Sequence, residues 1–275
     1  MKFWALSLVS LAICFGQGAA GPGDARAKRV IDDAVQALGG QKFLTMEDRI
    51  ESGRAYSFYR EQLSGLSIAK IYTRYLTVAD GKSGEELGVR ERQNFGKAED
   101  SGVLFREDGG AWEITFRGAR ALETDRIARY KDTTLRNIFY IFRQRLKEPG
   151  LIFESRGADV IQNVPVEIVD ITDSENRLVT VYFHQSTKLP VRQKWSWRDP
   201  QTRERNDEVT TFNRYRDSGG GVQWPYQIER QRNGEKVYEI FSETVTVNQN
   251  LSDSMFASPS VMVAPPKANT PSRKK

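Results

Sequence analysis

Side chains that could perform catalysis or bind a metal are scarce in this chain. His184 is the single histidine among 275 residues, and Cys14 is the single cysteine. A Ser-His-Asp triad or a zinc site with His and Cys ligands cannot be assembled from one histidine alone. We therefore expect His184, which directly precedes a predicted turn, to have a structural or surface role.

Neighbouring carboxylates are the next candidates for chemistry. Glu85-Glu86 and Asp207-Glu208 are such pairs, and glycoside hydrolysis requires two carboxylates held across one cleft. Neighbours on a strand point to opposite faces, so these pairs are more typical of a surface. The chain also has no Gly-x-Ser-x-Gly elbow and no phosphate-binding glycine loop. We predict no enzyme activity, hence no catalytic residue, no metal ligand and no cofactor.

The remaining chemistry is that of aromatic and aliphatic surface, since Phe, Tyr and Trp make up 11% of the chain. These side chains could fill an ordinary core, or they could line a cavity that a wide curved sheet encloses for an apolar ligand. Core residues would be fully buried, whereas cavity residues would border a void. The candidates for cavity or lid are Leu135, Ile138, Phe139, Phe142, Leu146, Tyr72, Trp112, Trp195 and Trp197.

Five of these candidates share a helical face. Residues 135, 138, 139, 142 and 146 fall at i, i+3, i+4, i+7 and i+11 within a segment from about Thr124 to Lys147 that has no turn residues. Pro149 follows and ends the segment. Ile127 and Tyr130 indicate an earlier turn or a second short helix, with Asp132 as a possible cap. The segment fits either core packing or a lid across the mouth of a barrel.

A second helix is predicted near the start of the chain. Apolar residues recur at four-residue spacing between Ala25 and Leu38, Asp24 is a plausible N-cap, and Gly39-Gly40 should stop the helix. Most of the remainder alternates with period two, as in half-buried antiparallel strands. Trp195 and Trp197, for example, oppose Lys194 and Ser196. We predict one β-rich domain of about ten strands over residues 24–260.

The two ends of the chain differ from this domain. Residues 1–20 combine Lys2, an apolar run and a small-residue exit near Ala20, the pattern of a cleaved secretory signal. The run is short for a membrane span. Lipidation of Cys14 is an alternative, although Ile13 is bulky for that signal. Residues 261–275 are rich in Pro, Ser and Lys and are predicted to be a disordered basic tail.

Export removes several function classes. Outside the cytoplasm there is no nucleotide cofactor pool and no chromosome, and no nucleic-acid motif is present. The formal charge of +5, or +4 without Lys2, is spread along the chain and indicates a solvated surface. A sharper interpretation is attraction to anionic lipid head groups, which would give peripheral association with the outer membrane. Charges on both faces of residues 204–214 argue against an integral barrel.

The layout resembles the periplasmic lipoprotein carriers of the LolA type, within the outer-membrane lipoprotein-sorting superfamily. The resemblance covers about residues 24–260. It rests on the order of four local stretches, which are residues 38–40 closing the first helix, Ser186-Thr187-Lys188-Leu189-Pro190 after a strand, Trp224-Pro225-Tyr226 after a glycine-rich turn, and Asn248 with residues 253–259.

This resemblance implies an α+β fold, mainly β, in which an open antiparallel barrel or half-barrel carries an N-terminal helix and a mid-chain helical lid over an apolar cavity. It implies a non-enzymatic periplasmic carrier of lipid or lipoprotein acyl chains, with envelope membrane proteins as donor or acceptor, no nucleic-acid partner and a monomeric state. An envelope-stress sensor or scaffold of the same fold, with a protein partner, is the alternative. The arginine that gates the lid in such carriers cannot be placed among the many arginines here.

Overall fold

One antiparallel sheet forms most of the protein. The computed structural model describes residues 22–78, 86–99, 101–199 and 202–260, so the predicted signal (1–20), Glu85 and the predicted tail (261–275) lie outside the described residues. Thirteen strands follow the order β6-β5-β4-β3-β2-β1-β13-β12-β11-β10-β9-β8-β7. The prediction of an open antiparallel sheet with helices is confirmed, but the count of about ten strands was too low, because short strands of four or five residues show little alternation.

Strands that follow one another in the chain pair with each other, except β6 and β7, which form the two edges of the sheet. The pairing of β1 with β13 joins a first group of strands, β1 to β6, to a second group, β7 to β13. The strands are β1 (Asp48–Tyr59), β2 (Gln62–Tyr75), β3 (Val89–Phe95), β4 (Ser101–Phe105), β5 (Ala111–Thr115), β6 (Gly118–Ala121), β7 (Ile152–Ile161), β8 (Val164–Thr172), β9 (Leu178–His184), β10 (Pro190–Arg198), β11 (Arg205–Asp217), β12 (Gln223–Arg232) and β13 (Glu235–Val247).

The first helix, α1 (Pro22–Leu38), begins before the predicted cap, so Asp24 lies inside it. It ends where predicted, since Gly39 and Gly40 have φ angles of 124° and 57°, a region that glycine enters without a steric penalty. Gly39 also allows a close approach, because a Cβ there would lie 2.8 Å from the carbonyl oxygen of Gly221. The short helix α2 (Gln41–Leu44) follows.

The mid-chain helical segment is divided in two. Helix α3 (Thr124–Leu135) is separated from α4 (Ile138–Tyr140) and the π-helical turn η1 (Ile141–Arg145). The cap is Asn137, whose side-chain oxygen accepts hydrogen bonds from the N–H groups of Phe139 and Tyr140 at 3.0 and 3.3 Å. The predicted cap, Asp132, instead lies within α3, where its carboxylate pairs with Arg136 one turn later.

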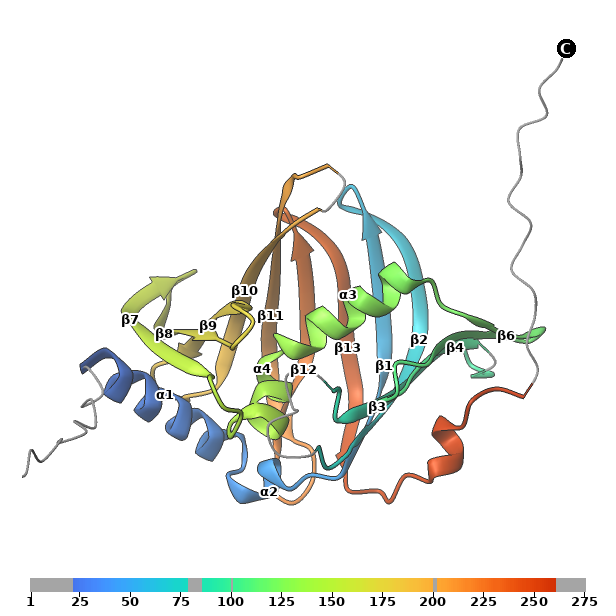
Figure 1. The fold of residues 1–275 in the computed structure, drawn as a ribbon, viewed down its shortest axis with the longest axis horizontal. Helices are drawn as coiled ribbons and strands as arrows, with labels where there is room; N and C mark the ends of the chain where they lie inside the picture. The colour runs from blue at the N-terminus through green and yellow to red at the C-terminus, as the bar shows by residue number, and fades with distance from the viewer. Residues whose placement is uncertain (1–21, 79–85, 100, 200–201, 261–275) are drawn as a thin grey trace, which may run out of the picture.

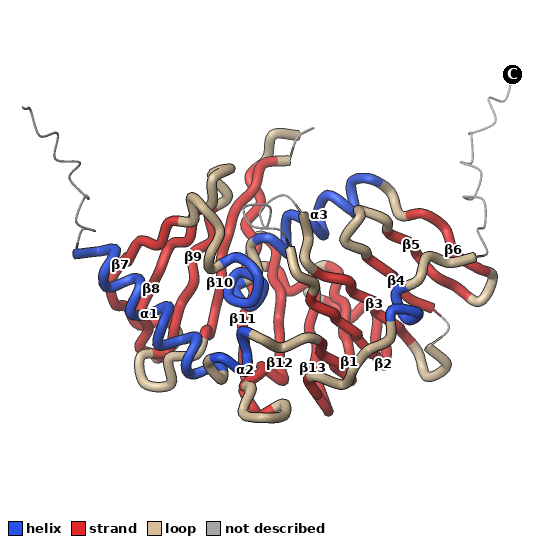
Figure 2. The backbone as a smooth tube through the Cα atoms, turned by 60° about the horizontal axis from the view of Figure 1, so that its bottom comes forward, coloured by secondary structure: helices blue, strands red, loops and turns tan. Residues whose placement is uncertain are grey.

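The sheet is strongly curved, and α1 to α4 lie on one of its faces (Figures 1 and 2). We call this the inner face; Val181, Gln193 and Phe212 project from it. The opposite, outer face is covered in part by the C-terminal segment, where Leu251 and Phe256 pack on Leu104. Phe256 belongs to the 3-10 helix η2 (Asp253–Phe256).

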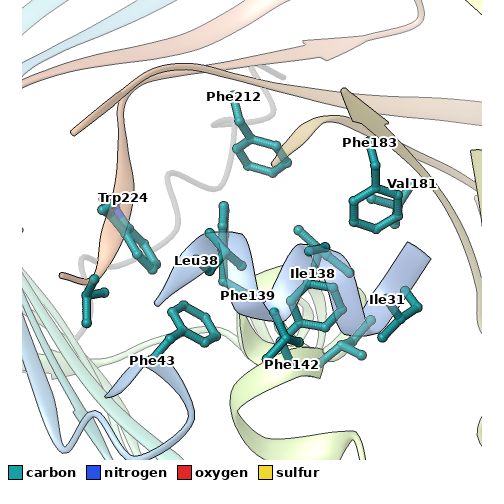
Figure 3. Packing of buried hydrophobic residues seen from close by; sticks show 14 of the residues in the cluster. Ile31, Leu38, Phe43, Ile138, Phe139, Phe142, Val181, Phe183, Phe212 and Trp224 are labelled. Atoms are coloured by element: carbon teal, nitrogen blue, oxygen red, sulfur yellow. The ribbon is translucent and has the colours of Figure 1, made fainter. Parts of the chain in front are cut away.

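The main core lies between the inner face and the helices α1, α2, α4 and η1 (Figure 3). Phe139 of α4 is central to it, with ring centroids of Phe43, Phe212 and Trp224 at 6.5, 5.0 and 4.7 Å. Burial of each such side chain contributes about 1.5–3 kcal/mol. Because β7 to β13 supply the sheet side of this core, α1 and α4 cover the second strand group and leave much of the first uncovered.

Candidate ligand-binding site

Helix α3 joins two distant parts of the sheet. The ring of Tyr130 stacks on Phe105 of β4, with centroids 3.6 Å apart and planes at 4°. The guanidinium of the preceding residue, Arg129, lies 5.2 Å from the ring centroid of Trp197 in β10. Six strands separate β4 from β10, which is about 34 Å across a flat sheet at ~4.8 Å per strand. Two consecutive residues can reach both strands only because the sheet is folded into a trough that α3 crosses.

The C-terminal end of α3 is its anchored end. Leu135 is the single residue of α3 that is fully buried, in a cluster with Leu87, Val89 and Tyr140. Burial raises the pKa of Tyr140 to about 12, so its hydroxyl stays neutral while it accepts the N–H of Gly88 at 2.8 Å. The rest of α3 is held by Tyr130, Ile127 and long arginine side chains. This attachment is slight compared with that of α4.

A buried ionic network fastens the turn that follows. Arg145 of η1 donates to Glu148 at 2.6 Å, to Asp173 at 2.7 Å and to the carbonyl oxygen of Leu135 at 2.5 Å. Burial opposes ionisation of Asp173, but the hydrogen bond from Arg145 and the contacts of Arg177 outweigh it and hold the pKa of Asp173 below its ordinary value. The network ties the end of α3 to the loop between β8 and β9.

An apolar surface lies on the inner face of the strands that α3 crosses. It consists of buried Ala55, Ala69 and Ile240 with half-buried Ile71, Phe95, Ile228 and Tyr238. We call these seven residues the inner-face cluster. All of them belong to β1, β2, β3, β12 and β13, so strands alone pack the cluster. Burial raises the pKa of Tyr238, which keeps its hydroxyl neutral and the surface uncharged.

Buried charge separates this cluster from the main core. Arg49 donates to Glu51 and to the hydroxyl of Thr73 at 3.0 Å, and its guanidinium lies 4.2 Å from the Trp224 ring centroid. Ser242 donates to Glu51 from β13. Because they are paired and hydrogen-bonded in this way, the charges of Arg49 and Glu51 can remain buried. The inner face therefore has a packed part under α1 and α4 and a partly exposed apolar part on the strands that α3 crosses.

The structure separates the residues that the sequence proposed for a ligand site. Ile138, Phe139 and Phe142 lie in the main core, Leu146 packs half-buried against it, and Leu135 belongs to the α3 anchor. None of the five lines the pocket of about 760 Å³ beside Trp195 or the smaller one of about 250 Å³ beside Phe105 and Tyr130. Their contact with a ligand stays a prediction.

The four sheet aromatics divide between the two faces. Tyr72 and Trp112 lie on the outer face, near Leu251 and Phe256, and the Tyr72 hydroxyl donates to Glu99 at 2.9 Å. Trp195 and Trp197 lie on the inner face, where Arg136 and Arg129 of the α3 segment cover their rings at 4.7 and 5.2 Å. Only the two β10 tryptophans therefore lie beside α3.

Sequence reasoning missed the inner-face cluster and the bridging role of Arg129 and Tyr130. The alternation of Tyr238 with Ile240, and of Ala69 with Ile71, was a usable signal for a shared face. It could not show that this face is the inner one.

The polar candidates have structural partners. The Nδ1 atom of His184 accepts the N–H groups of Ser186 and Thr187 at 3.0 and 3.3 Å, which stabilises a turn. The carboxylate of Asp207 accepts a hydrogen bond from the Ser196 hydroxyl. Glu208, on the opposite face of β11, accepts one from the Arg232 guanidinium. Within the described ranges there is no group of three His, Cys, Asp or Glu residues that could hold a metal ion. None of the described helices is long and apolar enough to cross a membrane.

Three solved structures share this fold. A protein described as an outer membrane lipoprotein-sorting domain, from Vibrio parahaemolyticus, has a TM-score of 0.54 at 9% identity, and a DUF1329 family protein from Desulfovibrio piger has 0.55 at 15%. A LolA superfamily protein from Nitrosomonas europaea has 0.52 at 9%. Each match covers 84% of this chain and 97% of the other. No protein-family model and no curated protein sequence matches the chain. At these identities the likeness is one of fold, and it confirms the LolA-like fold that the sequence resemblance implied.

Proposed function

We propose that this protein is a non-enzymatic periplasmic carrier that binds the acyl chains of a lipid or lipoprotein on the inner-face cluster, beneath α3. One observation carries the proposal. Consecutive residues of α3 contact β4 and β10, so the helix crosses an apolar surface that strands alone pack. The fold likeness to a protein described as an outer membrane lipoprotein-sorting domain supports it.

The binding energy would come from burial of hydrocarbon. Each CH₂ removed from water contributes about 0.8 kcal/mol, so a long chain binds without polar recognition. Ile71, Phe95, Ile228 and Tyr238 offer half-buried apolar area, and Trp195 and Trp197 extend it towards β10. Loading and release require α3 to shift, and a membrane-protein donor or acceptor would bias that equilibrium.

The other predicted residues fit this site less directly. Leu135, Ile138, Phe139, Phe142 and Leu146 would contact a chain only if it displaced core packing. Tyr72 and Trp112 would require a separate outer-face contact.

The first test is native mass spectrometry of the protein purified from periplasm, with solvent extraction of bound material. We expect an intact mass that lacks residues 1–20 and a co-purifying lipid or acylated peptide. A ligand-free mass together with failure to take up a fluorescent fatty acid would contradict the carrier proposal.

A matched pair of variants locates the site. Ile71 and Ile68 lie on the same strand but on opposite faces, and Ile68 is 44% exposed. Ile71→Asp should reduce fatty-acid affinity at least tenfold, because it places a charge on the apolar surface. Ile68→Asp should change the affinity less than twofold. Circular dichroism and thermal unfolding would verify that both variants remain folded, and equal losses of affinity would contradict the assignment of the site to the inner face.

One surface favours the alternative function of sensor or scaffold. Tyr59, Leu63, Leu66 and Ile68 are all exposed on the β1–β2 hairpin, and exposed apolar patches are frequent at protein interfaces. This alternative predicts a stable protein partner and weak exchange of cargo. It would be favoured if the protein had no lipid bound and did not take up the fatty acid.

A further inference from the structure

A step in the sheet creates a pocket next to the proposed acyl-chain site. Strand β10 pairs with β9 through residues 190–194, whereas Ser196, Trp197 and Arg198 pair with β11 alone. A pocket of about 760 Å³ opens at this step. We call it the step pocket. Residues of β7 to β11 line it together with Asn176 and, from the end of α3, Arg136.

The lining of the step pocket is strongly basic. It contains five cationic side chains, Arg136, Arg156, Lys194, Arg198 and Arg205, and a single carboxylate, Asp170. Asp132 and Asp207 pair with Arg136 and Arg205 from outside the lining. Two positive charges remain uncompensated even when both of these carboxylates are counted.

Arg198 and Arg156 contribute most of this excess. Within the described part of the chain, Arg198 forms no ion pair, and it donates to the carbonyl oxygen of Arg203 at a long 3.4 Å. Arg156 lies 3.7 Å from Asp170 and is largely exposed. The pocket therefore presents a positive potential that would attract an anion.

Arg136 brings one further guanidinium to the pocket, from the end of α3. Its side chain is only 11% exposed, and its guanidinium lies 4.7 Å from the Trp195 ring centroid. Its Nε atom is buried and has no hydrogen-bond partner among the described residues. Because this atom is closed to solvent, a ligand would reach it only after the Arg136 side chain moves.

We propose that the step pocket binds the phosphate head group of an anionic amphiphile. Guanidinium groups present paired N–H donors that match phosphate oxygens. Lys194, Arg198 and Arg205 project from the outer face, whereas Trp195 and Trp197 line the pocket from the inner face beside α3. The pocket therefore passes the edge of β10 that β9 leaves unpaired. An amphiphile would hold its head group at the outer side of this edge and extend its acyl chain past the two tryptophans to the inner-face cluster. This inference names the ligand class of the proposed carrier and rests on that proposal for the position of the chain.

The test uses the mature protein and calorimetric titration with four probes, which are dihexanoyl phosphatidylglycerol, dihexanoyl phosphatidylcholine, glycerol 1-phosphate and inorganic phosphate. We expect the anionic lipid to bind at least tenfold more tightly than the other three, and its affinity to fall as salt is raised. Equal affinity for glycerol phosphate would overturn the lipid assignment and identify a site for a free phosphate ester.

Two double variants isolate the pocket. Arg156→Gln with Arg198→Gln removes two charges from the lining, and Arg54→Gln with Arg117→Gln removes two from exposed positions outside it. The first should weaken binding of the anionic lipid about tenfold or more, and the second less than twofold. Equal effects of the two variants, or no effect of the first, would overturn the proposal.

A neutral apolar probe, phenylnaphthylamine, distinguishes this inference from the carrier function. The pocket variant should retain wild-type affinity for it while losing preference for the anionic lipid. If the wild-type protein bound the anionic head group but did not take up phenylnaphthylamine, the carrier function would be contradicted and the phosphate site would be supported.

Discussion

Phe139 contacts three aromatic rings and is 2% exposed, so its side chain acts chiefly as core. We expect Phe139→Ala to lower the free energy of unfolding by about 3–5 kcal/mol, because it leaves a cavity among rings that cannot collapse fully. Urea denaturation followed by circular dichroism measures this change.

Phe116 provides the control for this measurement, since it is 78% exposed. Phe116→Ala should change the free energy of unfolding by less than about 0.5 kcal/mol. A stable Phe139→Ala protein that fails to bind fatty acid would show instead that Phe139 lines a ligand cavity, which was the second interpretation of its sequence pattern.

Single residues also show where local spacing succeeds. The alternation around Trp195 predicted that both β10 tryptophans share a face, and they do. The same rule did not predict which face of the sheet carries Tyr72 and Trp112, which lie on the outer face. Their strands alternate equally well, and nothing local marks which face will receive the helices.

At the scale of the element, α3 is the part of the fold that the proposed function requires to move. Tyr130→Ala removes the stack on Phe105 and thus one of the two ends of the bridge. We expect the release rate of a bound fluorescent fatty acid to rise about threefold to tenfold, since a stacked aromatic pair contributes about 0.5–1.5 kcal/mol beyond its burial. Stopped-flow displacement by excess unlabelled fatty acid measures that rate.

Tyr59→Ala is the matched control, because Tyr59 is exposed at the tip of the β1–β2 hairpin. It should leave the release rate unchanged. An unchanged rate in Tyr130→Ala as well would show that α3 does not limit release.

The division of the mid-chain segment was only partly visible in the sequence. The five apolar residues from Leu135 to Leu146 fit one continuous helical face. In the structure Leu135 anchors α3 while the others belong to the core or its margin. Asn137 interrupts the helix because its side chain caps α4 and because Gln193 accepts the N–H of Ile138 at 3.0 Å. The second contact comes from 55 residues away and has no local signature.

At the scale of the whole molecule, paired carboxylates make stability dependent on pH. Hydrogen bonds hold the pKa values of three carboxylates below their ordinary values. Asp207 accepts mainly from the Ser196 hydroxyl and also from Arg205, Glu107 accepts from Arg90, and Asp173 accepts from Arg145 against the opposing effect of burial. The folded state therefore binds fewer protons than the unfolded state near pH 4, and stability rises with pH through that range. We expect the thermal midpoint to be constant near neutral pH and to fall progressively below about pH 4.5.

Thermal unfolding at pH 7, 5, 4 and 3 checks this expectation, and Arg145→Met provides the comparison. That variant leaves Glu148 and Asp173 without their buried arginine, so its midpoint should be lower at pH 7 and should fall less steeply in acid. A wild-type midpoint that stays level down to pH 3 would contradict the expectation.

The sequence by itself determined the fold class, the early helix and the strand-rich character of the chain. The period-two alternation, the stop at Gly39-Gly40 and the single histidine were sufficient to predict a β-rich domain with an early helix and no triad. These features are local, since spacing along the chain decides which side chains share a face. The order of local motifs was also enough to indicate the LolA-like fold.

Only the tertiary structure decided where a ligand could bind. The inner face and the bridge of α3 between β4 and β10 depend on pairings such as Arg49 with Val247. Such pairings join residues nearly two hundred positions apart, and sheet curvature is the sum of many of them. Periodicity in a short window of sequence carries no information on strand pairing or on sheet curvature. The same alternating strand can therefore face a helix or the solvent.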